Sequence, residues 1–405
     1  MSALRSPAVR IILVSSQPIP HVGGLSTHFL LLRRALRETG MLLCAISAGD
    51  FDQGLCQQMG GLLLRLTGGR EVGRRKLLER RVRRLTHRLR KALQDIDCSS
   101  LIHCHDPLAT VAALTACSSC GVQIPVVQTV HGPWSREAIM GGAKPGGAHV
   151  ARIRALEEEA FTGATHLIAV DMGQARILAD SFDVPSNKVT VIPNAVDAAG
   201  IATLSAGLGT SGIHEPYFVV PRRLVKKNGV DVAVQAMTLL QHSVSTLVIA
   251  GSGPLLDELR HSATNLNLAG RIVFLGDVAT EALLPLMRRS SGVIIPSVPS
   301  EGVVEATSLA ALEALACGAP LIASSIGGLS EIVSRAAAGF LFPPGDAIAL
   351  AGIMRELEDT PLDRLDVLRK RSLAAAQLFD VHPWFEAIKA VYTTLSPAIA
   401  PTLAL

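Results

Sequence analysis

The stretch GVIIPSVPSEGVVEATSLAALEALACGAPLIASS, residues 292–325, reads as a strand, a helix and a second strand in succession. Two strands joined through a helix form the repeating unit of a parallel sheet. The helix is expected to begin near Thr307 and Ser308, with Glu305 just ahead of it and Glu313 about two turns into it. Because a buried ionised carboxylate is costly without partners, the two glutamates indicate a polar ligand.

The same alternation runs through all 405 residues. It predicts an α/β protein whose parallel sheets are covered by helices on both faces. Ligands in such folds lie beyond the carboxyl ends of the strands, so the residues just after each apolar run matter most. The predicted strands lie in RIILVSS (10–16), MLLCAIS (41–47), LIHCHD (101–106), PVVQTVH (125–131), HLIAVD (166–171), KVTVIP (188–193), YFVVPR (217–222), STLVIAG (245–251), RIVFLG (271–276), GVIIPS (292–297), PLIASS (320–325) and GFLFPP (339–344).

The two halves meet in a stretch rich in Gly, Ser and Ala without clear periodicity, residues 194–216. We therefore expect a Rossmann-like domain over 1–195, a linker over 196–216 and a second Rossmann-like domain over 217–380. Two similar α/β halves of this kind predict a central ligand cleft where they face one another.

Composition limits the class of protein. No uninterrupted run of eighteen apolar residues occurs, and the first apolar run is too short for a signal peptide, so we expect an intracellular, cytoplasmic protein. Seven scattered cysteines, an odd number, favour free thiols over a disulfide framework.

One segment is strongly basic: residues 62–97 hold twelve Lys and Arg against four Asp and Glu. Within it, Leu78, Val82, Leu85, Leu89 and Leu93 recur at helical spacing, which predicts an amphipathic helix over 74–93. The helix either packs on its own domain with a solvated basic face, which we favour, or contacts the inner face of an anionic membrane. Nucleic acid is disfavoured because no aromatic residues are interleaved for base stacking.

Glycines and cations follow several predicted strands. Gly23 and Gly24 stand before a helix, where they either cradle a phosphate or make a tight turn. In PRRLVKKNGVD the cations either bind a diphosphate or form an exposed basic turn; they are Arg222, Arg223, Lys226 and Lys227.

Two further strand ends add to this pattern. LVIAGSGP places Gly251 after a strand but lacks the third glycine of a nicotinamide-binding fingerprint. The hydroxyl of Thr307 or of Ser308 can cap the helix that begins there. The backbone amides of Ser308 and Leu309 can hold a phosphate. Carboxylates beside such a phosphate site suit the vicinal hydroxyls of a ribose or a sugar ring.

These motifs together resemble a known family. EATSLAALEALACGAPLIASSIGGLSEIV, residues 305–333, resembles the signature of retaining glycosyltransferases of family 4, which have the GT-B fold. GGLSTH, QTVHG, VIPNAVD, RRLVKKNGVD, IAGSGP and FLGDV follow the family's order over nearly the whole chain.

The resemblance implies transfer of a hexose-type sugar, with retention, from a nucleotide diphosphate donor of UDP or GDP type. The acceptor would be a lipid, a glycan or a small natural product held in the cleft of the N-terminal domain, with no tightly bound cofactor and no metal. The helix over about 381–396 would cross back onto the first domain.

The resemblance also implies residue roles. Glu305 would contact the donor sugar, Glu313 the nucleotide ribose, and His131 would lie beside the transferring sugar, with the base near Asp277. The implied catalytic residues are His131, Arg223, Lys227 and Glu305. The implied donor-binding residues are Gly23, Gly24, Arg223, Lys227, Gly251, Val278, Glu305, Thr307, Ser308, Leu309 and Glu313.

The chain departs from the family at two places. Asn228 stands where the family usually has its diphosphate lysine, so we assign that role to Lys227. The family's Gly-Phe-Gly after the first glutamate is replaced here by residues 306–308, Ala-Thr-Ser, which narrow the donor pocket.

Other functions remain open. The chain is alternatively a GT-B isomerase or hydrolase of a nucleotide sugar, a phosphorylase, or a catalytically silent nucleotide-sugar binder. A zinc site of His103, His105, Cys117 and Cys120 is disfavoured by its unusual spacing. His28 matches a common family position or is a packed helix residue, and Asp95-Ile96-Asp97 is interpreted as the end of a helix.

Overall fold

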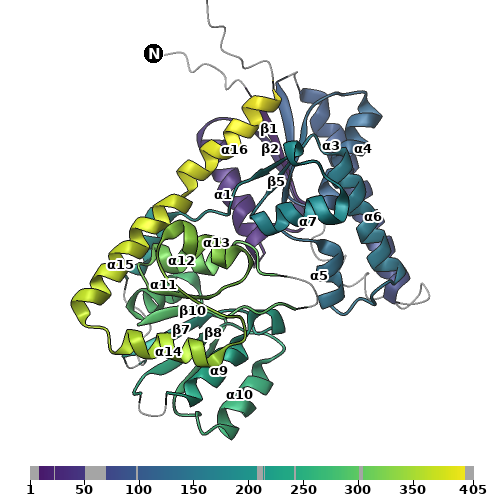
Figure 1. Ribbon diagram of the computed structural model, residues 1–405. Helices are drawn as coiled ribbons and strands as arrows, with labels where there is room; N and C mark the ends of the chain where they lie inside the picture. Colours follow the sequence, from purple (N-terminus) through teal and green to yellow (C-terminus); the bar gives the residue numbers. More distant parts are fainter. Residues whose placement is uncertain are drawn as a thin grey trace, which may run out of the picture. The chain divides into compact units, whose positions relative to one another are not determined.

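The computed structural model describes residues 9–21, 23–50, 70–96, 99–207, 213, 215–240, 243–300 and 304–396. The chain divides into two compact units: unit 1 joins Met1–Pro193 to Trp384–Leu405, and unit 2 is Asn194–Pro383. Within the described residues, each unit is a six-stranded parallel sheet flanked by helices (Figure 1). Each of the twelve strands falls in one of the twelve predicted apolar runs, except that β3 begins one residue earlier, at Ser100, and this agreement confirms the predicted fold class.

The sheet of unit 1 has the strand order β2-β1-β3-β4-β5-β6. Its strands are β1 Arg10–Val14, β2 Leu42–Ile46, β3 Ser100–Cys104, β4 Val126–Val130, β5 His166–Ala169 and β6 Val189–Val191. Its helices are α1 Gly24–Glu38, α3 Arg70–Ala92, α4 Pro107–Cys120, α5 Trp134–Met140, α6 Ala148–Gly163, α7 Met172–Phe182 and most of α16 Val381–Leu395.

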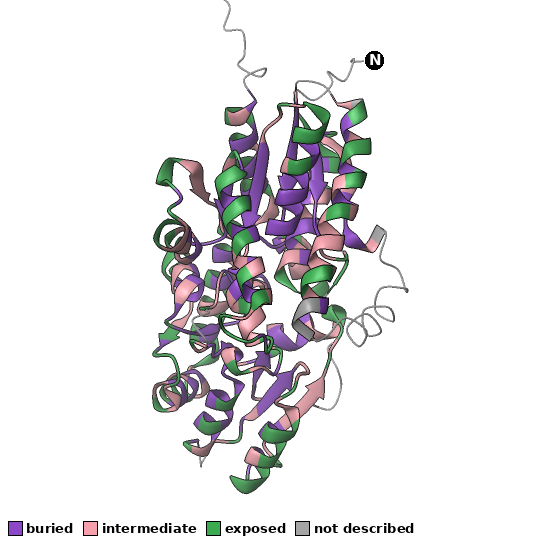
Figure 2. Ribbon diagram, turned by 90° about the vertical axis from the view of Figure 1, so that its right-hand side faces the viewer, coloured by how far each residue is buried: buried purple, intermediate pink, exposed green. Residues whose placement is uncertain are grey.

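Helices cover both faces of this sheet, because the strands are apolar on both sides. Ile12 and Ile102 face the core that α3 and α4 close, with Leu85 and Leu89 of α3 fully buried there. On the opposite face α16 lies against β3, where the Tyr392 ring packs edge-on to His103. The inner strands β3 and β4 are buried, the edge strands β2 and β6 are mostly half-buried, and the outer helix surfaces are exposed (Figure 2).

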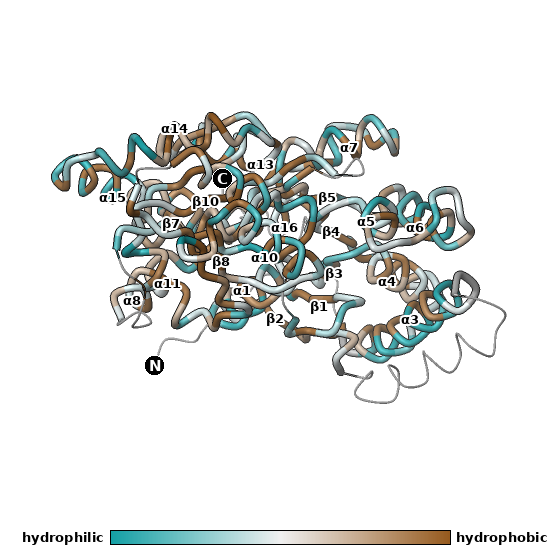
Figure 3. The backbone as a smooth tube through the Cα atoms, turned by 90° about the horizontal axis from the view of Figure 1, so that it is seen from below, coloured by the Kyte–Doolittle hydropathy of each residue, from teal (hydrophilic) through white to brown (hydrophobic). Residues whose placement is uncertain are grey.

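The predicted basic helix is α3. Its apolar stripe is buried at Leu85, Leu89 and Leu93, while Arg83 and Arg90 are exposed. Figure 3 accordingly shows hydrophobic and hydrophilic positions mixed along α3. Residues 62–69 of the basic segment lie outside the described residues. Among the described helices, none is both long and apolar enough to cross a bilayer.

The sheet of unit 2 has the order β12-β11-β10-β7-β8-β9. Its strands are β7 Tyr217–Pro221, β8 Thr246–Ala250, β9 Ile272–Gly276, β10 Gly292–Ile295, β11 Leu321–Ser324 and β12 Phe340–Phe342. Its helices are α8 Ala198–Ser205, α9 Val230–Thr238, α10 Leu256–Asn265, α11 Thr280–Arg289, α12 Leu309–Ala316, α13 Gly327–Ala336, α14 Ala347–Glu358 and α15 Leu362–Ala376.

Alternate residues of the strands in unit 2 pack into two separate hydrophobic cores. Val219 and Ile295 point into the core closed by α11, α12 and α13, whereas Val220 and Ile294 point into the core closed by α9 and α14. Part of the predicted linker 196–216 belongs to the first core, so that prediction was wrong for α8. The reason is packing: Ala198 is buried there and Asp197 caps the helix by accepting from Gly200 N.

Candidate active site

Polar side chains gather where two neighbouring strands of unit 2 end. Arg222 follows β7 directly, and Ser297 follows β10 by two residues. The loop from β10 to α12 carries Glu305 and Ser308 to the same place, as the hydrogen bonds below show. Carboxyl ends of parallel strands meet at one edge of a sheet, which is where ligands of such folds bind.

Arg222 is the centre of this group. Its Nη2 lies 2.8 Å from Glu305 Oε2 and 2.6 Å from Asn228 Oδ1, and it also donates to Ser297 Oγ at 3.2 Å. Its Nη1 donates to Ser308 Oγ at 3.1 Å. The Arg222 and Glu305 side chains are only 10% and 12% exposed, so these charge-assisted bonds are little screened by solvent. The Glu305 carboxylate is therefore held in a fixed position.

Asn228 occupies the place of the family's lysine. It is buried, and its Nδ2 donates to Arg223 O at 2.7 Å while its Oδ1 accepts from Arg222. In the described part of the chain, the side chains of Arg223 and Lys227 make no hydrogen bond or ion pair, and Arg223 is exposed. The buried amide of Asn228 thus fixes Arg222, and the side chains of Arg223 and Lys227 are available to a ligand.

The start of α12 differs from the prediction in one respect. Ser308 is the N-cap residue, but its hydroxyl does not cap the helix, because it accepts from Arg222 instead. Within the described residues, the first-turn amides of α12 are therefore left without a side-chain cap. Such amides, at the positive end of a helix, favour an anion.

Glu313 lies one turn into α12, not two, because the helix begins at Leu309. Its carboxylate makes no hydrogen bond or ion pair within the described residues. Burial raises the pKa of Glu313 to about 7, so this carboxyl is partly protonated at neutral pH. It can therefore donate to a ligand oxygen as well as accept from a hydroxyl.

Two glycines of the sequence motifs support the backbone of this site. A Cβ on Gly251, which has φ +151°, would lie 2.1 Å from Arg222 O. A Cβ on Gly327, which has φ +46°, would lie 2.2 Å from Glu305 O, and the next amide, Gly328 N, donates to that same oxygen at 3.1 Å. Side chains at these positions would displace the segments that carry Arg222 and Glu305.

The structure also describes the two segments that were expected to contact the nucleotide base and a phosphate. Ser252 Oγ donates to Asp277 Oδ1 at 2.6 Å on the exposed end of unit 2, next to the half-buried Val278. In unit 1, Gly23 is the N-cap of α1 with φ +147°, and no side chain among the residues that the structure describes caps this helix. Ser26 does not serve as a cap, because its Oγ accepts from His21 N at 3.0 Å.

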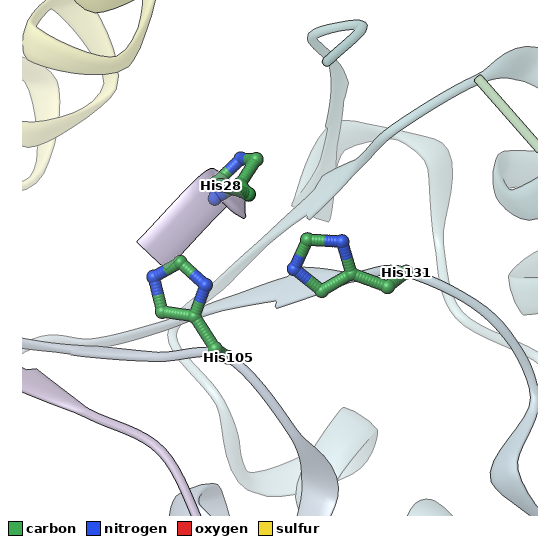
Figure 4. A group of neighbouring side chains, drawn as sticks. All are labelled: His28, His105 and His131. Atoms are coloured by element: carbon green, nitrogen blue, oxygen red, sulfur yellow. The ribbon is translucent and has the colours of Figure 1, made fainter. Parts of the chain in front are cut away.

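Unit 1 holds a cluster of histidines. His131 follows β4, His105 follows β3 and His28 lies on α1, and their rings converge (Figure 4). Their centroids are 4.8 Å apart for His28 and His131 and 4.9 Å for His28 and His105. Burial lowers the pKa of His131 to about 3 and that of His28 and His105 well below the usual value, so all three rings are neutral.

The disfavoured zinc set is not assembled. Both ring nitrogens of His103 are engaged, Nδ1 at 2.5 Å from Tyr392 Oη and Nε2 at 2.8 Å from Thr129 Oγ1. Cys117 lies in the core on the other face of β3, with α3 and α4. Alternation along the strand thus separates the histidines from this cysteine. Of the Asp95-Ile96-Asp97 stretch, Asp95 ends a short 3-10 helix and Asp97 lies outside the described residues.

Two family descriptions match the chain in succession. Glycosyltransferase Family 4 matches residues 22–199, and Glycosyl transferases group 1 matches residues 211–373. Together they match most of each unit and include both groups of polar residues described above. The chain belongs to the family-4 glycosyltransferases.

Curated relatives of this glycosyltransferase include a glycogen synthase of Mycobacterium tuberculosis. It is 30% identical over 279 residues, which are 68% of this chain and 63% of the relative. An uncharacterized glycosyltransferase of Methanocaldococcus jannaschii is 28% identical over 65% of this chain and 67% of its own. The matched region thus spans about two thirds of the length of these relatives.

Solved structures share the fold of this glycosyltransferase. Sucrose-phosphate synthase from Thermosynechococcus elongatus has a TM-score of 0.71 at 22% identity and covers 96% of this chain and 100% of its own. Anabaena HepE in complex with UDP has a TM-score of 0.67 at 18% identity, with coverage of 96% and 100%. At these identities the likeness establishes the GT-B fold alone.

Sequence reasoning about this glycosyltransferase selected Glu305 and Ser308, which the structure brings together. It named Arg222 among four cations that could bind a diphosphate but gave that role to Arg223 and Lys227, it noted Asn228 only as a departure from the family, and it did not single out Ser297. The signal for Arg222 was present in the doubled arginine of PRRL, where one cation faces inward and the next is exposed. Nothing in the sequence distinguishes which arginine takes which direction.

Proposed function

We propose that this chain is a retaining glycosyltransferase that moves a hexose-type sugar from a UDP- or GDP-type donor to an acceptor nucleophile. The Glu305 carboxylate, fixed by Arg222 beside uncapped helix amides, carries this proposal. A fixed carboxylate suits sugar hydroxyls, and the amides suit the adjoining phosphate.

The proposed chemistry depends on a stabilised leaving group. The bond from the anomeric carbon to the phosphate oxygen breaks, and a bond from the acceptor oxygen forms on the same face of the sugar. The departing phosphate oxygen takes the proton of the acceptor hydroxyl. Arg223, Lys227 and the first amides of α12 stabilise the charge that develops on the diphosphate, because fixed donors need no reorganisation during the reaction.

Glu305 supports the positive charge that builds on the sugar ring and acts without forming a covalent bond. His131 contacts the transferring sugar from unit 1, as the family resemblance implies. Glu313 binds the ribose hydroxyls, and its raised pKa lets it either donate or accept there. Gly24 and Val278 complete the donor contacts, at a phosphate and at the base.

We infer an acceptor class and a location for the enzyme from the basic surface of α3. Arg80, Arg83, Arg84, His87 and Arg88 line a cavity of about 440 Å³ on this helix. We propose that this basic surface meets the anionic inner face of a membrane, where a lipid acceptor would be presented. Co-sedimentation with phosphatidylglycerol vesicles tests this: binding should fall in an Arg83→Gln/Arg88→Gln variant and vanish with neutral phosphatidylcholine.

The donor is tested by thermal shift and calorimetry with UDP, GDP, ADP, TDP and their common sugar conjugates, with and without Mg²⁺. A ligand at a hundred times its dissociation constant should stabilise the folded state by about 2.7 kcal/mol. One nucleotide should stand out, and Arg223→Ala should weaken its binding.

Product analysis then separates the alternatives. Release of free sugar or conversion of the donor without an acceptor product indicates a hydrolase or isomerase, and binding without turnover under any acceptor indicates a silent binder. The absence of binding by all four nucleotides would overturn the proposal.

A further inference from the structure

We propose that His28, His105 and His131 form a binding site for a divalent transition-metal ion of the Zn²⁺ class, with one coordination position open to water. The site lies wholly in unit 1 and uses none of the residues of the Arg222 network. Three protein ligands with a fourth position open is the arrangement of catalytic zinc sites built from histidine.

The geometry places one nitrogen from each ring in a common space. The three ligand atoms all lie within 4.8 Å of one another, and the rings come from three different elements (Figure 4). Zinc–nitrogen bonds of about 2.0–2.1 Å place tetrahedral ligands roughly 3.4 Å apart. Closing around an ion therefore requires ring shifts of about 1 Å, which side-chain rotation can supply.

The second observation is the set of ring nitrogens without partners. Both nitrogens of His28 and His105 and the Nε2 of His131 are buried and make no hydrogen bond to any of the described residues. His28 and His105 are each 1% exposed. Buried polar atoms are almost always satisfied, so five orphaned nitrogens in one cluster point to a ligand that binds there.

The framework around the rings is firm. His105 stacks on His103 at 4.9 Å, and His103 is held by Tyr392 and Thr129. The residue after His105, Asp106, caps α4 through Ala109 N and accepts from Ser16 N at 2.6 Å. The His105 backbone is thereby fixed on both sides, which limits the movement needed for an ion to bind.

The chemistry of the ligands selects the ion. Among the described residues, this group of metal-capable side chains contains imidazoles and no carboxylate. Imidazole nitrogen suits zinc, copper and nickel, whereas magnesium and calcium prefer oxygen. Trp384 packs against His28 at 4.9 Å, and its indole N–H, also without a partner, offers a donor to a bound water.

If the proposed function holds, metal binding inhibits transfer. His131 is the residue proposed to contact the transferring sugar. An ion bound to its Nε2 would prevent that contact. Zn²⁺ should then lower the transfer rate reversibly, with recovery on addition of EDTA, while calorimetric binding of the free nucleoside diphosphate stays unchanged. This consequence depends on transferase activity, whereas the binding site itself does not.

The binding test uses the full-length protein stripped with EDTA and titrated with Zn²⁺ alone by calorimetry at neutral pH. One equivalent should bind to the wild type, and His28→Asn and His105→Asn should each weaken that binding at least tenfold. His261→Asn and Cys120→Ser, which change an exposed histidine and an exposed cysteine, are the matched controls and should bind like the wild type.

Co²⁺ added to the wild type provides a readout that requires no variant. A tetrahedral cobalt spectrum without a thiolate charge-transfer band is expected for an all-imidazole site. Absence of stoichiometric Zn²⁺ binding, a thiolate band, or unchanged binding in both folded histidine variants would each overturn the proposal. Circular dichroism establishes that the variants are folded; if they are not, the wild-type cobalt spectrum decides.

Discussion

The two clusters of polar residues in this glycosyltransferase are built on opposite principles. In unit 2, the Arg222 side chain bonds to Glu305, Asn228, Ser297 and Ser308, so charge is buried together with its partners. In unit 1, neutral histidines lie together, and five of their ring nitrogens have no hydrogen-bond partner in the described part of the chain. The first cluster pairs its charges within the protein and, among the described residues, leaves only Arg222 Nε without a hydrogen bond, whereas the second leaves most of its ring nitrogens without one.

This difference separates two uses of a polar group. A network of paired groups serves to position a residue. Its buried charges have partners, so it destabilises the fold less than unpaired buried groups would, and it holds Glu305 in place for a substrate. An unsaturated cluster is destabilising until something binds, so its occupation changes the stability of the protein as well as its activity. The predictions below test this contrast, beginning with the largest expected effect.

Glu305→Gln should lower kcat/KM for sugar transfer by about 10²–10³-fold, because the fixed charge beside the reacting ring is lost. Steady-state kinetics with the donor identified by calorimetry measures it. Glu281→Gln, on the exposed first turn of α11, is the control and should retain the wild-type rate. A fully active Glu305→Gln enzyme would remove this residue from the site.

Glu313→Gln should change how stability depends on pH. The Glu313 pKa is raised from 4.5 to about 7 in the folded state, so the folded state holds a proton that the unfolded state has released. The free energy of unfolding of the wild type therefore falls as pH rises from 4.5 to 7, and the variant should be more stable at pH 8 by up to about 3 kcal/mol. Urea unfolding at pH 4.5 and 8 measures this; an equal difference at both pH values would contradict it.

Asn228→Lys should lower kcat/KM by roughly ten- to a hundredfold, about 1.4–2.7 kcal/mol. It restores the family's lysine but places a second cation beside Arg222 and removes both hydrogen bonds of the buried amide. Asn228→Ala, which removes the same two hydrogen bonds without adding a cation, is the control and should lose less activity. A gain of activity in Asn228→Lys would show instead that the lysine reaches the donor without disturbing Arg222.

Tyr392→Phe should destabilise unit 1 by about 1–2 kcal/mol, because it leaves the buried Nδ1 of His103 without a partner. His103 would then resemble the three unsatisfied histidines beside it. Tyr217→Phe, which removes a 2.9 Å bond to Leu286 O in unit 2, is the matched control. Denaturant unfolding of both should show similar losses, and Zn²⁺ binding should survive in both; its loss in Tyr392→Phe alone would tie His103 to the metal site.

The fold was predictable because its signal is repeated. Each strand, such as β7 or β10, is a short apolar run followed by a helical pattern, and parallel sheets covered on both faces require just that. The exception was α8, whose short Ala- and Gly-containing sequence resembles a linker and becomes helical through packing on the core and the Asp197 cap.

The site was predictable only where a motif fixes the backbone. Glu305 and Ser308 lie in a loop that Gly327 holds, so their place follows from the motif. The direction of a side chain does not follow from a motif. Arg222 and Arg223 are neighbouring residues of the same type, yet only the Arg222 side chain points toward Glu305. The convergence of His28 with His105 depends on how α1 packs against the strand ends, which no local pattern encodes.

Helix α16 also has a consequence for the order in which the protein is made. Trp384 and Tyr392, which close the histidine side of unit 1, are synthesised some two hundred residues after its last strand, β6. Unit 2 is one continuous segment and can fold as soon as it leaves the ribosome, because domains generally fold as units. The half of the enzyme that is translated first therefore completes its fold only after α16 has been made, because Trp384 packs against His28 and Tyr392 against His103.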